Sequence, residues 1–234
     1  MLAPLTNIFA DFISLLYPQE CLACQELLAR GEKTICTDCR INLPYTNSHL
    51  LTKTDSELLQ RFYNKVPVKY AFAYLYFTRL GRVQKLLHAL KYQGHEEVGQ
   101  ILGNWYGADL KESNYHQQFD LIVPVPLHLK KLKKRGYNQS DSFAKGLAQV
   151  LEVPWEATIL ARTADTSTQT KKTRLERWQN VGALFSIADP GTVYNKRVLL
   201  VDDVMTTGAT LEACALVLLE AGAQEVSVAA IASA

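Results

Sequence analysis

The sequence lacks three features that would each indicate a particular class of protein. It has no apolar run near the ~20 residues that a transmembrane helix requires. It has no Gly-Lys-Ser or Gly-Lys-Thr tripeptide, which excludes a nucleotide-binding P-loop. Its formal net charge is only +2, too small to indicate a nucleic-acid-binding protein by itself.

The first 18 residues are apolar but contain no lysine or arginine, and they include Asp11. A signal peptide or a membrane-surface anchor would require basic residues, so neither is favoured. Their apolar side chains recur at helical spacing, which predicts an amphipathic helix packed on the body of the protein. We therefore expect a cytoplasmic protein with no membrane insertion.

Four of the five cysteines form two C-x2-C pairs separated by eleven residues. Two such knuckles can fold together into a tetrahedral thiolate set for structural Zn²⁺. Two disulfides are the alternative, but nothing in the sequence indicates export. The zinc either only holds the module together or presents it to nucleic acid or a partner. The predicted ligands are Cys21, Cys24, Cys36 and Cys39.

The most informative stretch is RVLLVDDVMTTGAT, residues 197–210. Val198 to Val201 are apolar on both faces, as in a buried strand of a parallel sheet, and two aspartates stand where that strand is predicted to end. A hydroxyl-rich loop and a helix from Leu211 to Ala221 follow. The backbone N–H groups of such a loop can bind phosphate, whereas the carboxylates can accept hydrogen bonds from vicinal sugar hydroxyls or lie near a divalent cation.

This arrangement predicts a site for a ribose 5-phosphate. The alternative is an ordinary strand–turn–helix with solvated aspartates. The stretch resembles the phosphoribosyl-pyrophosphate (PRPP) motif of type I phosphoribosyltransferases. The predicted PRPP-binding residues in it are Asp202, Asp203, Thr206, Thr207, Gly208, Ala209 and Thr210.

Five cations occur within six residues directly after a second apolar strand, Leu121 to Val125. Such a run is commonly a solvated face, but ligands of open parallel sheets bind at the carboxyl ends of strands. We predict that Arg135 faces the diphosphate of PRPP, and that the neighbouring side chains contact the phosphates and bases of a single strand. These predicted nucleic-acid contacts are Lys130, Lys131, Lys133, Lys134 and Tyr137.

Residues 163–180 form a long polar stretch of the kind that often serves as a lid or a binding loop. Its cations Lys171, Lys172 and Arg174 are the candidate catalytic residues, because they could stabilise a pyrophosphate leaving group. Apolar segments at Tyr70–Phe77, Ile159–Ala161 and Val226–Ile231 add strands to the two already named. Interleaved with helical segments, they predict a doubly wound, mostly parallel α/β sheet.

With these pieces in place, the chain resembles the ComF (competence protein F) family along essentially its whole length. The resemblance rests on CLAC and CTDC, LKYQG at 90–94, PVPLH at 124–128, KRGYNQS at 134–140, and VLLVDDVMTTGAT. It implies a sheet of the type I phosphoribosyltransferase kind behind a small zinc module. We expect an N-terminal helix, a zinc finger (about 20–42) and a connector in residues 1–66, and the phosphoribosyltransferase-like domain in residues 67–234.

The resemblance also implies a role in natural transformation, with incoming single-stranded DNA and a helicase as partners and Mg²⁺ accompanying PRPP. In purine-salvage relatives an aspartate that assists the nucleobase looks to stand at the position of Thr206, and threonine has no pKa suited to that task. Two hypotheses follow. The chain is a PRPP-binding competence factor that handles single-stranded DNA, or it is an active phosphoribosyltransferase with an unidentified acceptor.

Overall fold

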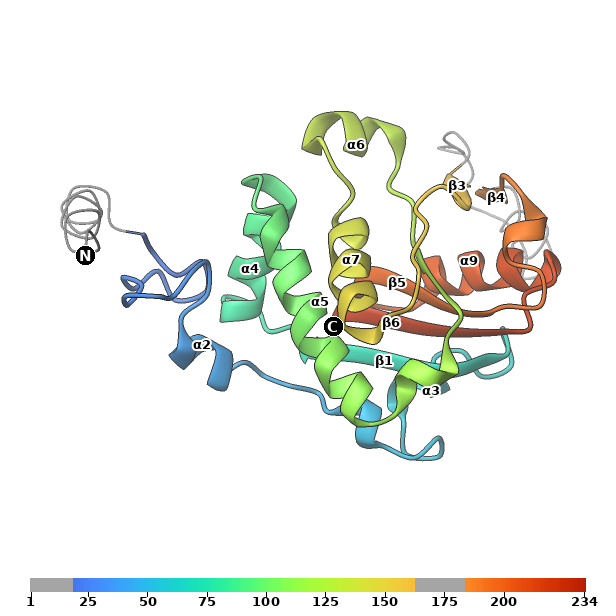
Figure 1. The fold of residues 1–234 in the computed structure, drawn as a ribbon, viewed down its shortest axis with the longest axis horizontal. Helices are drawn as coiled ribbons and strands as arrows, with labels where there is room; N and C mark the ends of the chain where they lie inside the picture. The colour runs from blue at the N-terminus through green and yellow to red at the C-terminus, as the bar shows by residue number, and fades with distance from the viewer. Residues whose placement is uncertain (1–18, 163–183) are drawn as a thin grey trace, which may run out of the picture.

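The computed structural model describes residues 19–162 and 184–234. Its centre is a four-stranded sheet in the order β1-β6-β5-β2, with all neighbouring strands parallel (Figure 1). The strands are β1 (Val68–Tyr76), β2 (Leu121–Pro124), β5 (Arg197–Met205) and β6 (Glu225–Ser233). The main helices are α4 (Arg82–Tyr92), α5 (Glu96–Glu112), α7 (Gln139–Leu151) and α9 (Ala209–Glu220).

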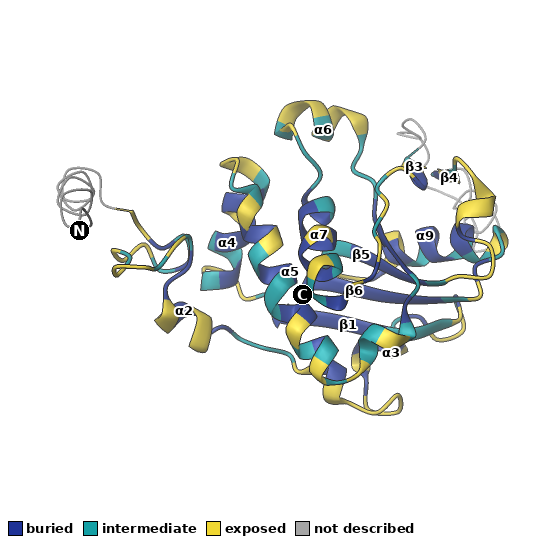
Figure 2. Ribbon diagram, viewed as in Figure 1, coloured by how far each residue is buried: buried dark blue, intermediate teal, exposed yellow. Residues whose placement is uncertain are grey.

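The sheet is covered on both faces, as a doubly wound fold requires. Along β5, Leu199 and Val201 pack into one apolar cluster with α4, α5 and α7. The alternate residues, Val198 and Leu200, pack into a second cluster with α9. Figure 2 shows most of each strand buried between these layers. The predicted α/β fold is confirmed, and its core explains why the central residues of β5, Val198 to Val201, are apolar on both faces.

Helices α5 and α7 approach each other through glycines. A Cβ atom on Gly103 would lie 2.5 Å from the carbonyl oxygen of Phe143 and 2.9 Å from the Cα of Gly146. A Cβ atom on Gly146 would lie 2.3 Å from the carbonyl oxygen of Gln100. Larger residues at either position would therefore force the two helices apart.

Two predicted strands differ from the observed ones. The strand predicted at 198–201 extends to Met205, because Asp202 and Val204 continue the parallel ladder with β6. The strand predicted near Ile159 forms as β3 (Leu160–Arg162), but it pairs antiparallel with β4 (Phe185–Ile187) in a separate two-stranded sheet. Its place in the main sheet was therefore wrong.

The basic segment after β2 forms a helix. Helix α6 (Leu129–Arg135) begins after His128 and ends at Gly136, whose φ of 84° lies in the left-handed region that glycine favours. Lysine, arginine and leucine are good helix formers, which outweighs the repulsion between neighbouring cations. Helix α6 stands out from the body at the top of Figure 1 and is largely exposed in Figure 2.

The N-terminal module and the segment after it pack directly on the body. Cys21, Cys39 and Leu43 belong to the same apolar cluster as Leu75 of β1. The predicted connector contains the short helix α3 (Glu57–Gln60), which lies on the face covered by α9. The short helix α2 (Thr37–Ile41) carries Cys39, the last of the four predicted zinc ligands. Within the described residues, no helix is both long and apolar enough to cross a bilayer.

Candidate functional site

The four predicted zinc ligands come together in the structure. The Sγ atoms of the four cysteines all lie within 4.8 Å of one another; the cysteines are Cys21, Cys24, Cys36 and Cys39. The Sγ atoms of Cys24 and Cys36 are 3.8 Å apart. Thiolates on a tetrahedral Zn²⁺ with Zn–S bonds of about 2.3 Å would stand about 3.8 Å from each other. The cluster therefore fits a structural zinc ion.

The electrostatics of the cluster also favour a cation. Burial opposes ionisation of Cys21, but backbone N–H groups donate to its sulfur from Cys36 at 3.2 Å and from Ala23 at 3.4 Å, so its pKa falls to about 7. Burial and the neighbouring thiols raise the pKa of Cys39. Four thiols this close cannot all ionise unless a metal ion compensates their charge.

The two aspartates of the PRPP-like motif lie side by side near the carboxyl end of β5. Their side chains are partly buried, and the backbone N–H of Asp203 donates to Oδ1 of Asp202 at 2.8 Å. Burial, reinforced by the negative charge of Asp203, raises the pKa of Asp202 to about 7. The site therefore holds one carboxyl group, that of Asp202, which resists ionisation.

Two side chains from other helices hold these aspartates. The Lys91 ammonium, at the end of α4, lies 2.9 Å from Oδ1 of Asp203, and both side chains are about four-fifths buried. The Ser140 hydroxyl, in the first turn of α7, donates to Oδ1 of Asp202 at 3.1 Å. Sequence analysis did not assign Lys91 or Ser140 to the site, although both fall inside segments that carried the family resemblance.

The loop after β5 is open to solvent. Thr206, Thr207 and Thr210 are exposed, whereas Gly208 is buried with a φ of 81°. The backbone N–H groups of Thr207, Gly208 and Thr210 donate to no other group among the described residues. Together with Asp202 the loop lines a small polar cavity of about 40 Å³. Free N–H groups at the start of α9 form an arrangement that binds anions.

The segment at α3 supports this loop from behind. The guanidinium of Arg61 donates to the carbonyl oxygens of Met205, at 3.3 Å, and of Thr206. The ring of Phe62 lies under Gly208, where an added Cβ would be 3.2 Å from its Cζ atom. These contacts explain why a small residue stands at position 208, and sequence analysis did not find them.

Helix α6 starts and ends at the same edge of the sheet as the aspartates. The backbone N–H of Val125 donates to the carbonyl oxygen of Val201 at 2.8 Å, which extends the β2–β5 pairing by one residue. The Asn138 amide then donates to the carbonyl oxygen of Val125 at 3.0 Å, so the excursion that carries α6 is closed at its base. The predicted meeting of these two segments at one edge is therefore observed.

The predicted residues of the basic segment take different positions. Arg135 donates to Oε1 of Gln139 at 2.6 Å, and its Cζ atom lies 5.1 Å from the ring centroid of Tyr92. Tyr137 is partly buried, and its hydroxyl donates to the carbonyl oxygen of Leu90. The lysines of α6 that are exposed are Lys130, Lys131, Lys133 and Lys134.

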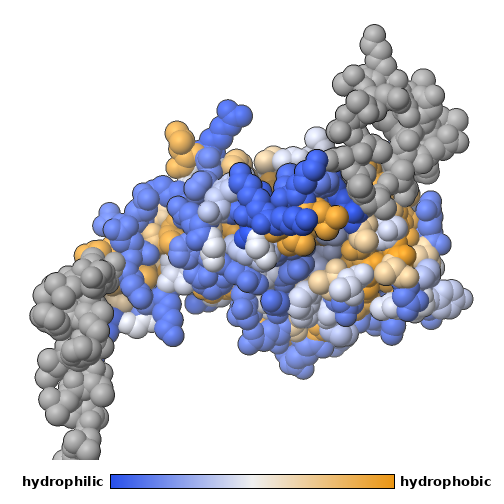
Figure 3. Space-filling view, turned by 90° about the horizontal axis from the view of Figure 1, so that it is seen from above, coloured by the Kyte–Doolittle hydropathy of each residue, from blue (hydrophilic) through white to orange (hydrophobic). Residues whose placement is uncertain are grey.

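Figure 3 shows a strongly hydrophilic patch near the centre of the face that carries α6. The three candidate catalytic residues, Lys171, Lys172 and Arg174, lie outside the described residues, as does the predicted N-terminal helix.

Among solved structures, the chain is similar to a glutamine PRPP amidotransferase from B. subtilis, at 26% identity and a TM-score of 0.44 over 62% of this chain and 30% of that one. It is also similar to a purine phosphoribosyltransferase from Pyrococcus horikoshii, at 21% identity and a TM-score of 0.36 over 57% of this chain and 73% of that one.

Residues 12–50 match the model of the double zinc ribbon domain, and residues 138–234 match that of the phosphoribosyl transferase domain. The DNA utilization protein YhgH of Escherichia coli K12 is 30% identical over 211 residues, which cover 89% of this chain and 87% of the relative. Competence protein F of Haemophilus influenzae is 32% identical over a region that covers 61% of this chain and 64% of that protein. Competence protein ComFC of Bacillus subtilis is 27% identical over 62% and 57%, respectively. The chain therefore belongs to the ComF/YhgH family of competence and DNA utilization proteins, in which a zinc ribbon precedes a phosphoribosyltransferase domain.

Proposed function

We propose that this protein binds PRPP at the carboxyl edge of its sheet and single-stranded DNA on the adjacent basic helix, and that it acts in DNA uptake and utilisation. The observation that carries this proposal is the pairing of Asp202 and Asp203 with an open anion-binding loop, on the same sheet edge as α6. The relatives named for competence and DNA utilization support the process.

The sugar and the 5-phosphate of PRPP would each have their own partners. The carboxylates of Asp202 and Asp203 would accept hydrogen bonds from the two ribose hydroxyls. The free N–H groups of residues 207–210 and the threonine hydroxyls would surround the 5-phosphate, with the helix dipole of α9 favouring its negative charge. Lys91 and Arg135 would supply the positive charge for the diphosphate.

Magnesium would enter the site bound to PRPP rather than as a free ion. Lys91 already balances the charge of Asp203, and burial keeps Asp202 partly protonated, so the free site offers little charge to a bare Mg²⁺. Magnesium is commonly bound through substrate phosphates with one or two carboxylates, which suits a Mg²⁺–PRPP complex.

DNA binding would depend on the cations of α6. Lys131, Lys133 and Lys134 are exposed and have no ion-pair partner among the described residues. Such a row of lysines can follow the phosphates of a single strand and would make binding strongly dependent on salt. The free thiols of the ribbon suit a reducing, cytoplasmic compartment, where a helicase partner would also be found.

Phosphoribosyl transfer is the second candidate, favoured by the match of residues 138–234 to the phosphoribosyl transferase domain. In that reaction an acceptor attacks the anomeric carbon of PRPP, the bond to the pyrophosphate oxygen breaks, and pyrophosphate leaves with its electron pair. Thr206 offers no ionisable group to a nucleobase acceptor. An acceptor other than a free purine would therefore be needed.

One experiment tests both candidates. The full chain is incubated with labelled PRPP, Mg²⁺ and a single-stranded oligonucleotide, and both retained PRPP and released pyrophosphate are measured. Retention without pyrophosphate supports the binding protein, whereas pyrophosphate that depends on the oligonucleotide supports the transferase. The matched variant Asp202→Asn with Asp203→Asn should lose retention while remaining folded. Full retention by that folded variant would refute the ribose assignment.

A further inference from the structure

An exposed group of aromatic and cationic side chains lies where α4 meets α6. His88 and Tyr92 are one turn apart on α4, with ring centroids 5.1 Å from each other. The Cζ atom of Arg135 lies 5.1 Å from the Tyr92 centroid, and its Nη2 atom is 3.5 Å from the Tyr92 hydroxyl. Tyr92 is nonetheless 61% exposed. We refer to His88, Tyr92 and Arg135 as the α4 stack.

Packing does not account for this arrangement. Tyr92 and His88 belong to neither apolar cluster of the sheet, whereas Leu87 and Leu90 on the same helix supply the core contacts of α4. A large aromatic side chain that is half exposed and held by a neighbouring cation is typical of a recognition surface.

The stack has positive charge on one side. Arg135 is the last residue of α6, so the exposed lysines of that helix follow directly from the stack. Figure 3 shows that side as strongly hydrophilic.

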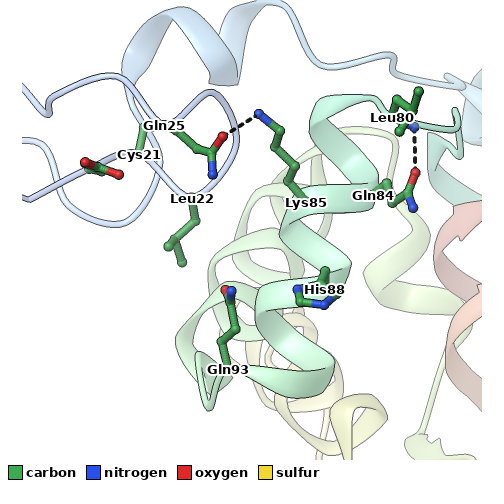
Figure 4. A pocket seen from close by; sticks show the side chains of 9 residues that line it. Cys21, Leu22, Gln25, Leu80, Gln84, Lys85, His88 and Gln93 are labelled. Atoms are coloured by element: carbon green, nitrogen blue, oxygen red, sulfur yellow. Dashed lines mark hydrogen bonds between the residues drawn. The ribbon is translucent and has the colours of Figure 1, made fainter.

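On its other side the stack opens into a groove of about 440 Å³ between α4 and the zinc ribbon. His88 lines this groove together with Lys85 and the amides of Gln84 and Gln93, and Figure 4 shows Lys85 reaching toward Gln25 of the ribbon. From the ribbon, Gln25 accepts a hydrogen bond from Lys85 at 2.9 Å. The lining contains one acidic residue, Glu20, and one lysine, Lys85.

We propose that the α4 stack is the base-stacking platform of a single-stranded DNA site, which runs from α6 into the groove beside the zinc ribbon. This inference rests on the proposed DNA-binding function and adds the residues that contact bases. Stacking on an aromatic ring tolerates any sequence, because every base has a π-face. The lysines of α6 hold phosphates, and the groove amides bind base edges.

The charge and the chemistry favour a nucleic acid strand over a peptide. A peptide partner would need acidic residues opposite α6, but it would gain little from the adjacent rings of His88 and Tyr92, whose planes are tilted by 46°. A strand offers phosphates and flat rings at alternating positions along one chain, which matches lysines followed by aromatic rings. Of the two tyrosines near the basic helix, Tyr92 rather than Tyr137 has an exposed ring.

The experiment compares two oligonucleotides of equal length, one of thymidines and one with abasic sites throughout, by fluorescence anisotropy at two salt concentrations. Tyr92→Leu should weaken binding of the thymidine strand about tenfold, leave the abasic strand unchanged and preserve the salt dependence. Tyr92→Phe should bind normally. Tyr194→Leu, at a tyrosine that is 70% exposed in the turn before β5, is the matched control and should bind normally.

The outcomes separate this inference from the function on which it rests. If Lys133→Gln with Lys134→Gln weakens binding and lowers the salt dependence while folded Tyr92→Leu binds both strands like the parent, the stacking platform is refuted and the DNA-binding function stands. If Tyr92→Leu weakens both strands equally, its role is not base stacking and the inference is likewise wrong. If the unmodified chain binds neither strand, both proposals are wrong.

Discussion

The ammonium of Lys91 lies 2.9 Å from a carboxylate oxygen of Asp203, although 112 positions separate the two residues in the sequence. The pair joins the end of α4 to the PRPP-like motif. The next residue along the chain, Tyr92, belongs to the α4 stack. The end of α4 therefore contacts the PRPP-like motif through Lys91 and lies at the outer surface through Tyr92.

Lys91→Met is expected to lower PRPP affinity about tenfold. The substitution leaves two adjacent carboxylates without their counter-charge and removes a cation from a site that binds a highly anionic ligand. Calorimetric titration with PRPP and Mg²⁺ measures the change. Lys145→Met is the matched control, because Lys145 pairs with Glu96 on the outer surface of the helices and should leave affinity intact. Equal affinities for the parent and Lys91→Met would remove Lys91 from the site.

Arg61→Ala is expected to loosen the loop that follows β5. Arg61 donates to the carbonyl oxygens of Met205 and Ala234, each at 3.3 Å, and also to that of Thr206. Without these bonds the loop loses its support, so PRPP affinity should fall several-fold and the melting temperature by about 2–4 °C. Arg61→Lys should recover only part of the lost affinity and melting temperature, because one ammonium group cannot donate to all three carbonyl oxygens at once. Arg79→Ala, at an exposed arginine, is the control.

Removing the metal is expected to destabilise more than the ribbon. The cysteines share one apolar cluster with β1, α4 and α5, so unfolding of the ribbon exposes part of the core of the body. We predict one zinc ion per chain by metal analysis, and a loss of at least about 5 °C in melting temperature after chelation. Cys21→Ser with Cys39→Ser should act like chelation. Cys214→Ala alters a buried cysteine outside the cluster and should keep the full metal content.

Acid should weaken the fold through Asp120. Hydrogen bonds from Arg197, at 2.7 and 3.0 Å, lower the pKa of Asp120 to about 2. An acid whose pKa is lower in the folded state stabilises the fold above its ordinary pKa, and this contribution disappears as the pH falls from about 4 to 2.

Asp120→Asn should therefore cost about 1 kcal/mol at pH 7, a value reduced for solvent screening because both side chains are about 30% exposed. The difference from the parent should shrink toward zero near pH 2. Urea unfolding at both pH values measures it. A difference that does not change with pH would show that the ion pair is not the cause.

The fold could be predicted largely because its core sequences satisfy a strict condition. Val198 to Val201 are apolar at every position, which is typical of a strand buried on both faces. The cysteine spacing was equally informative, since the two C-x2-C pairs do bring four sulfur atoms together. Such local patterns need no knowledge of topology.

The contacts that were missed depend on topology. Lys91, Ser140 and Arg61 reach the PRPP-like motif from segments 62 to 145 positions away, so no local pattern indicates them. The end of β5 was misjudged because aspartates are rare inside strands, and here they continue the ladder as far as Met205. The partner of β3 lies beyond a long polar stretch, which hid the separate hairpin.

The close contact between Gly103 and Gly146 fixes the position of α7 against α5. Ser140, in the first turn of α7, donates a hydrogen bond to Asp202. Because the two backbones are in contact, a methyl group added at either glycine would displace α7. That displacement would move the Ser140 hydroxyl away from Asp202. A substitution at either glycine would thus disturb the proposed ligand site from a distance, without changing any residue proposed to contact the ligand.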